Sequence, residues 1–292
     1  MKIRSENLHI RTLTKEDFLE MYKAFNSAFS DYIIPISLTL EQFKKRFLSK
    51  LQINFELSAG AFDSNDLIGF IFTGLGTYGG RKVAYNGGTG VLPEYRGNRI
   101  TARLYNLLFP LFRERNIEAS VLEVLTDNEK ALKVYKEIGF RESKYFHCFR
   151  KDLYTIDNVD DPNLKYIKVI HAPDWRLFRS FSNSSPSFLD YYDVITRNIS
   201  NEQIIVFENE NTIVGYAIYQ PELGRISQLA VAKNYRKRGV GTALINYIIK
   251  NSQTIAVTVL NVDSNSSDLI QFFKKLGFEN QLDQYEMYLP LS

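Results

Sequence analysis

Two basic turns in the sequence have the composition of an anion-binding site. They are "PEYRGNRITARLY", Pro93 to Tyr105, and "KNYRKRGVGTALI", Lys233 to Ile245, and each follows an apolar strand-like run and leads into a helix-like pattern. The first turn of a helix leaves backbone N–H groups unpaired and carries partial positive charge. Glycine in such a turn allows a positive φ and the close approach of a phosphate group. Both turns are therefore candidate phosphate sites.

The second turn, "RKRGVG", is the stronger candidate. Gly239 and Gly241 stand where the backbone must come close to a phosphate, and Arg236, Lys237 and Arg238 add positive charge. The spacing Arg-x-x-Gly-x-Gly differs from the Rossmann pattern and from the P-loop. Taken alone, this hexapeptide is equally typical of a basic glycine turn that caps a surface helix.

The first turn, "RGNRIT", departs from this pattern. It keeps Arg96 and Gly97 but has Arg99 and Thr101 where the second turn has glycine. The Cβ atom of Arg99 could strain the turn or hinder a phosphate, whereas its guanidinium group is itself a good phosphate partner. We interpret this turn as weakened and still able to bind.

The same order of elements surrounds both turns. Arg96 precedes the pair Gly139-Phe140 by 43 residues, and Arg236 precedes Gly277-Phe278 by 41. A shared order at nearly equal spacing indicates a duplicated domain. With the polar stretch Tyr154 to Asn163 as a linker, we expect an N-terminal domain at 1–155 and a C-terminal domain at 162–292. The expected fold class is α/β (α+β), with each domain a mixed, mostly antiparallel twisted sheet flanked by helices.

The turns and a later helix resemble one family together. "YRKRGVGTAL" matches the pyrophosphate loop of the GNAT superfamily of acyl-CoA-dependent N-acyltransferases, and "NEKALKVYKEIGF" matches its second signature through Asn128, Ala131, Tyr135, Gly139 and Phe140. The layout is similar to that of bacterial tandem (two-domain) GNAT proteins. The resemblance implies acetyl-CoA as cosubstrate, with its pantetheine arm in a split between the fourth and fifth strands. Those strands would be Tyr85–Leu92 with Ser120–Leu125, and Ile226–Val231 with Ile255–Val262.

The resemblance also implies a set of cofactor-binding positions. In the second domain these are Val231, Arg236, Lys237, Arg238, Gly239, Val240, Gly241 and Thr242. In the first domain they are Val91, Arg96, Gly97, Asn98, Arg99, Thr101 and Asn128.

Two residues of the first domain are candidates for catalysis. The resemblance implies that Tyr135 donates a proton to the departing thiolate; otherwise it is a core aromatic residue on an amphipathic helix. Glu123 could face the split and act as general base, or it could point to solvent from its strand. The second domain has Phe273 at the tyrosine position, four residues before Gly277, and Asn265 is our expected counterpart of Asn128.

Composition limits the other classes of function. Among 292 residues, Lys and Arg exceed Asp and Glu by 3, too few to indicate a nucleic-acid groove or a basic membrane surface. A single Cys148 fits a reducing compartment, and three scattered His make a metal site improbable. No apolar run of membrane length occurs, so we expect a cytoplasmic protein that binds neither nucleic acid nor membrane. Homo-oligomer formation is left open.

We therefore expect an N-acetyltransferase that moves an acetyl group from acetyl-CoA to a primary amine of a small molecule or peptide. Tyr135 and Glu123 favour the first domain for the chemistry, whereas Gly239 and Gly241 favour the second for tight CoA binding. One alternative is a non-catalytic acyl-CoA binder or sensor that uses the second turn. Another is transfer by the second domain without a tyrosine acid.

Overall fold

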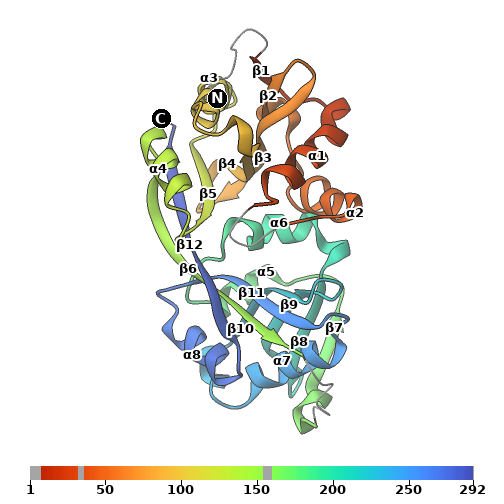
Figure 1. The fold of residues 1–292 in the computed structure, drawn as a ribbon. Helices are drawn as coiled ribbons and strands as arrows, with labels where there is room; N and C mark the ends of the chain where they lie inside the picture. The colour runs from red at the N-terminus through yellow and green to blue at the C-terminus, as the bar shows by residue number, and fades with distance from the viewer. Residues whose placement is uncertain (1–7, 32–35, 154–159, 292) are drawn as a thin grey trace. The chain divides into compact units, whose positions relative to one another are not determined.

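The computed structural model describes residues 8–31, 36–153 and 160–291. The chain forms two compact units (Figure 1). Unit 1 contains Met1–Ser143 and Glu286–Ser292, and unit 2 contains Lys144–Tyr285. Each unit is a mixed sheet with helices packed on it, as the sequence predicts.

The sheet of unit 1 is antiparallel except at one pair of strands. Its strands β1, β2, β3, β4 and β5 are neighbours in that order, and only β4 and β5 run parallel. The strands are β1 Leu8–Thr12, β2 Ala59–Asp63, β3 Asp66–Tyr78, β4 Arg81–Val91 and β5 Ala119–Leu125. The helices are α1 Phe18–Ala28, α2 Leu40–Lys44, α3 Ile100–Glu114 and α4 Glu129–Ile138.

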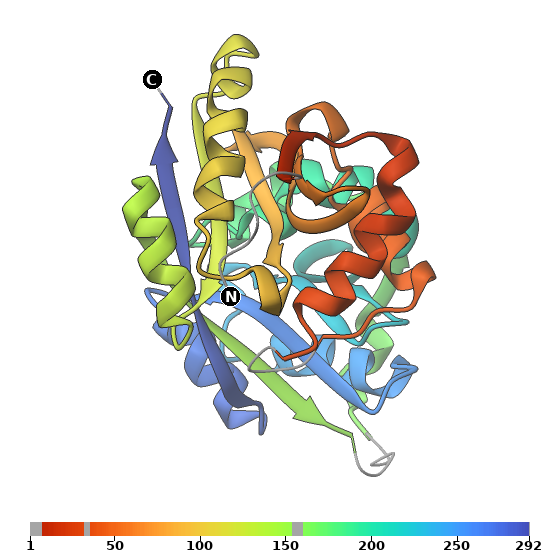
Figure 2. The same cartoon turned by 45° about the horizontal axis from the view of Figure 1, so that its top comes forward.

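The helices of unit 1 cover both faces of the sheet. A Cβ atom on Gly90 of β4 would meet Ala28 of α1 at 2.8 Å, whereas one on Gly69 of β3 would meet Ile100 of α3 at 2.7 Å. Gly69 pairs with Val91, the neighbour of Gly90, and alternate residues of a strand point to opposite faces. Helices α1 and α3 therefore lie on opposite sides, as Figure 2 shows. Fully buried phenylalanines fill the α1 side: Phe25, Phe43, Phe47, Phe70 and Phe72.

Unit 2 repeats this plan. Its strands lie in the order β6, β11, β10, β9, β8 and β7, and only β10 and β11 run parallel. The strands are β6 Arg141–Asp152, β7 Ile167–Ile170, β8 Gln203–Asn209, β9 Thr212–Gln220, β10 Arg225–Val231 and β11 Ala256–Asp263. The helices are α5 Trp175–Phe181, α6 Tyr192–Arg197, α7 Val240–Asn251 and α8 Ser267–Lys275.

Unit 2 also has an apolar cluster on each face of its sheet. One cluster joins α7 and α8 to strand residues such as Val257 and Val259 of β11. The other joins α5 and α6 to Tyr216 of β9, on which Phe178 stacks with ring centroids 3.9 Å apart. The α5–α6 face is therefore opposite to the face that carries α7.

The closing strands explain why the units differ from the expected ranges 1–155 and 162–292. Strand β6 begins in unit 1 but pairs with β11, where Val259 is opposite Phe149. Strand β12, Glu279–Pro290, begins in unit 2, and its end returns to unit 1, where the Leu291 N–H donates to the carbonyl of Glu118 at 2.9 Å. Each unit is thus completed by a strand that follows the other unit's helices. Of the expected linker, 154–159 lies outside the described residues.

Candidate active site

The two basic turns have the same backbone conformation. Each contains two residues in the left-handed region, separated by one residue. In the first turn these are Gly97 (φ 82°) and Arg99 (φ 57°); in the second they are Lys237 (φ 59°) and Gly239 (φ 84°). Each turn therefore places one glycine and one basic residue where a Cβ atom is unfavourable. The first turn is not weaker in this respect, because the second carries an equivalent strain at Lys237.

Gly241 has a packing contact, and the cofactor-binding role expected for it stays a prediction. Its φ is not positive, and a Cβ atom on it would lie 3.0 Å from the ring of Phe272 on α8. Glycine is needed here for the packing of α7 against α8. Counted back from the Gly-Phe pair, the residue of α4 equivalent to Phe272 is the smaller Val134, and the first turn has Thr101 at the glycine position.

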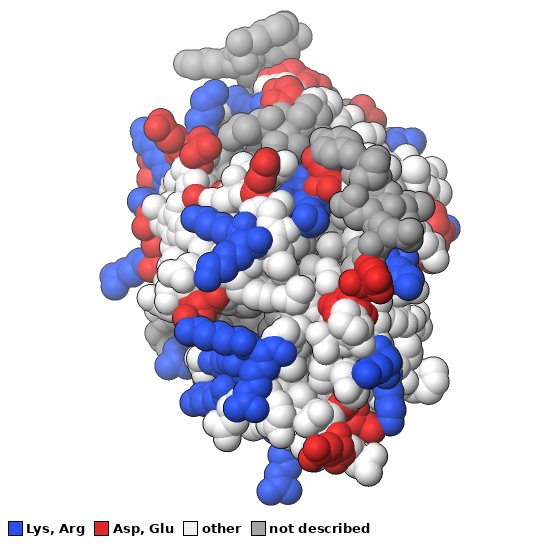
Figure 3. All heavy atoms as spheres, turned by 90° about the horizontal axis from the view of Figure 1, so that it is seen from below, with Lys and Arg blue, Asp and Glu red and all other residues white. Residues whose placement is uncertain are grey.

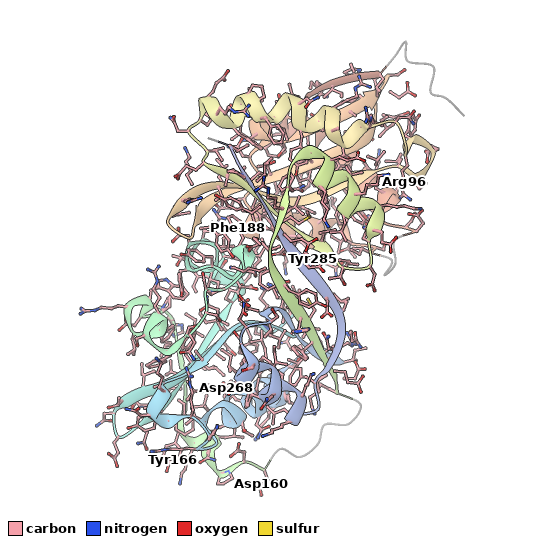
Figure 4. The ribbon with its side chains drawn as sticks, turned by 90° about the vertical axis from the view of Figure 1, so that its left-hand side faces the viewer. Arg96, Asp160, Tyr166, Phe188, Asp268 and Tyr285 are labelled. Carbon is pink, nitrogen blue, oxygen red and sulfur yellow. The ribbon has the colours of Figure 1, made fainter. Side chains whose placement is uncertain are left out.

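The first arginine of each turn fixes the turn to the end of a helix, α1 in unit 1 and α5 in unit 2. Arg96 (Figure 4) donates to both carboxylate oxygens of Asp31 at 2.7 and 2.8 Å and to the carbonyl of Ala28 at 3.0 Å. The ion pair holds the pKa of Asp31 below its usual value. Arg236 donates to the carbonyl of Phe181 at 2.8 Å. These contacts support a positioning role, and direct phosphate binding by either arginine stays a prediction.

The ends of the fourth strands are held by the same arginines. Nε of Arg96 donates to the carbonyl of Val91 and Nε of Arg236 to that of Val231, both at 3.1 Å. The Asn98 side chain donates to the carbonyl of Tyr95 at 2.9 Å, which fixes the first turn internally. Cofactor binding at Val91, Val231 and Asn98 stays a prediction.

The N-terminal ends of α3 and α7, which follow the two turns, have features of an anion-binding site. The cap residues Arg99 and Gly239 make no side-chain hydrogen bond to the first turns of α3 and α7. The N–H groups there, including those of Thr101, Val240 and Thr242, have no acceptor within the helix. A Cβ atom at Gly97 would meet nothing within 4 Å. Open backbone at a basic helix start is the arrangement that a phosphate requires; cofactor binding at both turns stays a prediction.

In both units the two parallel strands separate after a short paired stretch. Strand β4 pairs with β5 only from Val83 to Asn86, and β10 pairs with β11 only at Arg225 and Ile226. The register of β4 against β3 skips Gly87, and that of β10 against β9 skips Ser227. Such a bulge bends a strand. The expected split between fourth and fifth strands therefore begins at the bulge in each unit.

Glu123 is the first residue of β5 beyond the paired stretch, because Leu122 is the last partner of β4. Its Oε2 accepts a 2.9 Å hydrogen bond from the hydroxyl of Tyr85. Tyr85 is opposite Gly74, and Gly74 packs against Leu51. Leu51 directly follows the helical turn Lys45–Lys50, which carries Phe47 on the α1 side of the sheet. The half-buried carboxylate of Glu123 therefore lies at the split, on the face opposite α3.

The helix after β5 carries the second signature. Asn128 caps α4, and its Oδ1 accepts from the N–H of Ala131 at 3.1 Å. Tyr135 is 8% exposed and contacts the Phe140 ring edge-on at 5.8 Å. This burial is compatible with a packing role for the Tyr135 ring and with a role of its hydroxyl as a proton donor. Catalysis by Tyr135 therefore stays a prediction.

The counterpart of Asn128 differs from the one expected. Ser266, not Asn265, caps α8, and Ser266 precedes Gly277 by the same 11 residues that separate Asn128 from Gly139. Asn265 instead bonds Asp263, at 2.9 Å through its N–H. The extra residue of the second copy lies earlier, in the β11 bulge between Val259 and Val262.

Sequence reasoning missed Tyr85 as the partner of Glu123, and it did not identify the residue of unit 2 that stands at the Glu123 position. Register places Leu260 of β11 where β5 has Glu123, because Val259 and Leu122 are the last paired residues. Phe273, at the position of Tyr135, is fully buried against Phe278. The pairing of strands reveals the equivalence of Leu260 and Glu123, whereas that of Phe273 and Tyr135 follows from the spacing to the Gly-Phe pair.

Charge is distributed without a continuous basic surface on the face in Figure 3, where acidic side chains lie between groups of Lys and Arg. In the described ranges, no group of three or more His, Cys, Asp or Glu could hold a metal ion. Nor does the described part of the chain contain a helix long and apolar enough to cross a membrane.

Comparison with protein families assigns both units. The model of the acetyltransferase (GNAT) family matches residues 18–140, and an acetyltransferase (GNAT) domain model matches residues 200–280. The chain belongs to the GNAT acetyltransferases. It carries two GNAT domains in tandem, and the chemistry of that family is acetyl transfer.

Relatives of this GNAT protein agree with that assignment. An uncharacterized N-acetyltransferase of Methanocaldococcus jannaschii is 26% identical over 141 residues, which are 44% of this chain and 62% of that protein. A tandem GNAT protein of the clavulanic acid biosynthesis pathway has the same fold, with a TM-score of 0.70 at 12% identity, covering 98% of this chain and 99% of that one. A GCN5-related N-acetyltransferase of Sphaerobacter thermophilus also gives 0.70, at 13% identity, with 98% and 96% covered.

Proposed function

We propose that this protein is an acetyl-CoA-dependent N-acetyltransferase that acetylates a primary amine, with the chemistry in unit 1. The observation that carries the proposal is the position of Glu123. Its carboxylate lies where β4 and β5 begin to separate and on the face opposite α3, whose N-terminus bears the phosphate-binding turn. If the cosubstrate is held from the α3 side of the sheet, the amine can approach from the opposite face, where Glu123 lies.

The residues of unit 1 fit the steps of this transfer. Acetyl-CoA supplies the acyl group as an activated thioester. Glu123 accepts the proton that an ammonium group must lose before its nitrogen can attack the carbonyl carbon. The new C–N bond replaces the C–S bond, and Tyr135 donates its phenolic proton to the departing sulfur. The 2.9 Å bond from Tyr85 holds the carboxylate in place.

The first test measures the two turns separately. We expect calorimetric titration with acetyl-CoA to find two sites per chain, one lost in Gly239→Glu and the other in Arg99→Glu. Both substitutions place a carboxylate at a left-handed position in the phosphate cradle. Absence of binding in the wild-type chain would contradict the proposed function.

The second test measures transfer. Glu123→Gln should lower kcat by about 10²- to 10⁴-fold, the usual contribution of a general base, in a CoA-release screen across polyamines, amino acids, peptides and aminoglycosides. Glu118→Gln is the matched control, because Glu118 precedes the same strand and bonds the Lys82 N–H at 2.8 Å, away from the split. Equal loss in both variants would remove Glu123 from the mechanism.

A second candidate function is a non-catalytic acyl-CoA binder. It is favoured by unit 2, which keeps the phosphate-binding turn while Leu260 and Phe273 replace the carboxylate and the tyrosine. Persistent acetyl-CoA binding with no transfer to any amine in the screen would support it.

A further inference from the structure

The split of unit 2 differs from that of unit 1 in what lies against it. On the α5–α6 face, the chain enters a short 3-10 turn, η7, at Phe188–Asp190 before α6 begins. Ser187, Phe188 (Figure 4) and Asp190 are each at most 2% exposed. The segment Ser187–Asp190 is called here the bridging segment.

The bridging segment is bonded to the fourth strand of unit 2. A carboxylate oxygen of Asp190 pairs with Arg225 of β10 at 2.7 Å, with side chains 4% and 12% exposed. The backbone carbonyl of Asp190 accepts from Nε2 of Gln228 at 2.6 Å, and Gln228 in turn accepts from the Tyr216 hydroxyl at 3.0 Å. Arg225 and Gln228 lie on either side of the bulge at which β10 leaves β11.

The same segment is bonded to the fifth strand. Nδ2 of Asn261 in β11 donates to the hydroxyl of Ser187 at 3.3 Å. Asn261 is the left-handed residue (φ 58°) within the β11 bulge, so the extra residue of this copy directs its amide to the bridging segment. One short segment therefore spans the two strands where they separate, on the face opposite α7.

The equivalent positions in unit 1 are used differently. Tyr85, eleven residues before Arg96, corresponds to Arg225, eleven residues before Arg236. Tyr85 bonds the candidate base Glu123, whereas Arg225 bonds the bridging segment, and Leu260 stands at the base position. Unit 2 has thus lost the base and has a bonded segment where an acceptor amine would have to enter.

We propose that unit 2 binds acyl-CoA at its 236–242 turn without transferring the acyl group, because the bridging segment closes the acceptor side of its split. This inference rests on the proposed function for acyl-CoA binding. Under it, the chain has two cosubstrate sites and one transfer site, and only unit 1 is supplied with acceptor.

Hydrogen exchange tests the closure directly on the wild-type chain. The N–H groups of Asp190 and Tyr191 donate to the carbonyls of Ser187 and Phe188 at 3.1 Å each. We expect peptides that cover 187–191 to exchange at least tenfold more slowly than an unstructured peptide, with and without acetyl-CoA. Exchange at the unstructured rate would overturn the closure. This measurement does not require a variant that removes Asp190 and leaves Arg225 buried and unpaired, which could unfold the unit.

Measurements of acetyl transfer and of acetyl-CoA binding in variants then show which unit carries out the transfer. Glu123→Gln should still bind acetyl-CoA at the second turn, lose that binding when Gly239→Glu is added, and show at least 100-fold less transfer than wild type. Transfer that survives Glu123→Gln and disappears with Gly239→Glu would overturn the inference and make unit 2 the catalyst. Failure of the wild-type chain to bind acetyl-CoA would overturn the proposed function itself, a result distinct from loss of closure with binding intact.

Discussion

The hydroxyl of Tyr85 donates a 2.9 Å hydrogen bond to Oε2 of Glu123, and the two residues belong to the two strands that separate at this point. Tyr85 is 3% exposed, so its ring is fixed by packing and its hydroxyl has little freedom to turn away. A buried donor of this kind orients the carboxylate that it bonds.

Removal of this donor should slow transfer. In Tyr85→Phe the carboxylate of Glu123 loses the hydrogen bond that orients it. We expect kcat to fall by about tenfold, as loss of a bond of about 1.5 kcal/mol to a charged group implies, with acetyl-CoA affinity unchanged. Tyr78→Phe is the control, since Tyr78 bonds Glu286 at 2.6 Å instead. An equal fall in both variants would leave Tyr85 with only a structural role.

The strain in the turns predicts a gain in stability. Arg99 and Lys237 are the non-glycine residues held at positive φ in the two turns. Arg99→Gly and Lys237→Gly should each raise the free energy of unfolding by up to about 1 kcal/mol, because the left-handed conformation costs about 1–2 kcal/mol with a Cβ atom and glycine recovers part of this. Urea unfolding of each variant measures the change. Arg103→Gly, on an exposed helical position, should instead lower stability by about 1 kcal/mol, and a loss of that size in the turn variants would refute the argument.

The ion pair of Arg96 with Asp31 predicts an indirect effect on cosubstrate binding. Both side chains are nearly half exposed, at 44% and 49%, so solvent screens the pair and its contribution is small. Asp31→Asn should therefore weaken acetyl-CoA binding at the first turn by about fivefold or less, measured by calorimetry in a Gly239→Glu background. Glu56→Gln, which breaks the Arg115 pair, is the matched control. A loss far above fivefold would mean that Asp31 does more than position the turn.

The same pair gives the sign of a pH effect. The Arg96 hydrogen bond holds the pKa of Asp31 below its usual value, so the contribution of the pair is complete above the unfolded value of about 3.9. It is lost as pH falls through the lowered folded value. The difference between wild type and Asp31→Asn should consequently stay constant between about pH 6 and 8. A difference that changes within that range would point to another group.

The sequence predicted the parts of the site that depend on local pattern. The turns, their helices and the four strands that separate follow from apolar periodicity and from the fixed spacing to Gly139 and Gly277. The partner of Glu123 did not follow, because Tyr85 comes close only through the register of β4 and β5. The left-handed conformation of Lys237 did not follow either, because the residue type of a lysine does not indicate a positive φ. The strand exchange escaped prediction for a related reason: β6 and β12 have similar lengths and patterns, and either could close either sheet.

The packing of Gly241 predicts a compensating pair of substitutions. A Cβ atom at this position would lie 3.0 Å from the Phe272 ring, closer than an ordinary van der Waals contact. Gly241→Thr, which copies Thr101 of the first turn, should therefore lower the stability of unit 2 by about 1–3 kcal/mol through overpacking. Adding Phe272→Val, which copies Val134, should recover most of that loss, because the smaller side chain leaves room for the threonine. The coupling between the two sites, measured by urea unfolding of the wild type, both single variants and the double variant, should be about 1 kcal/mol or more. Additive effects would show that the glycine at 241 is required for something other than the contact between α7 and α8.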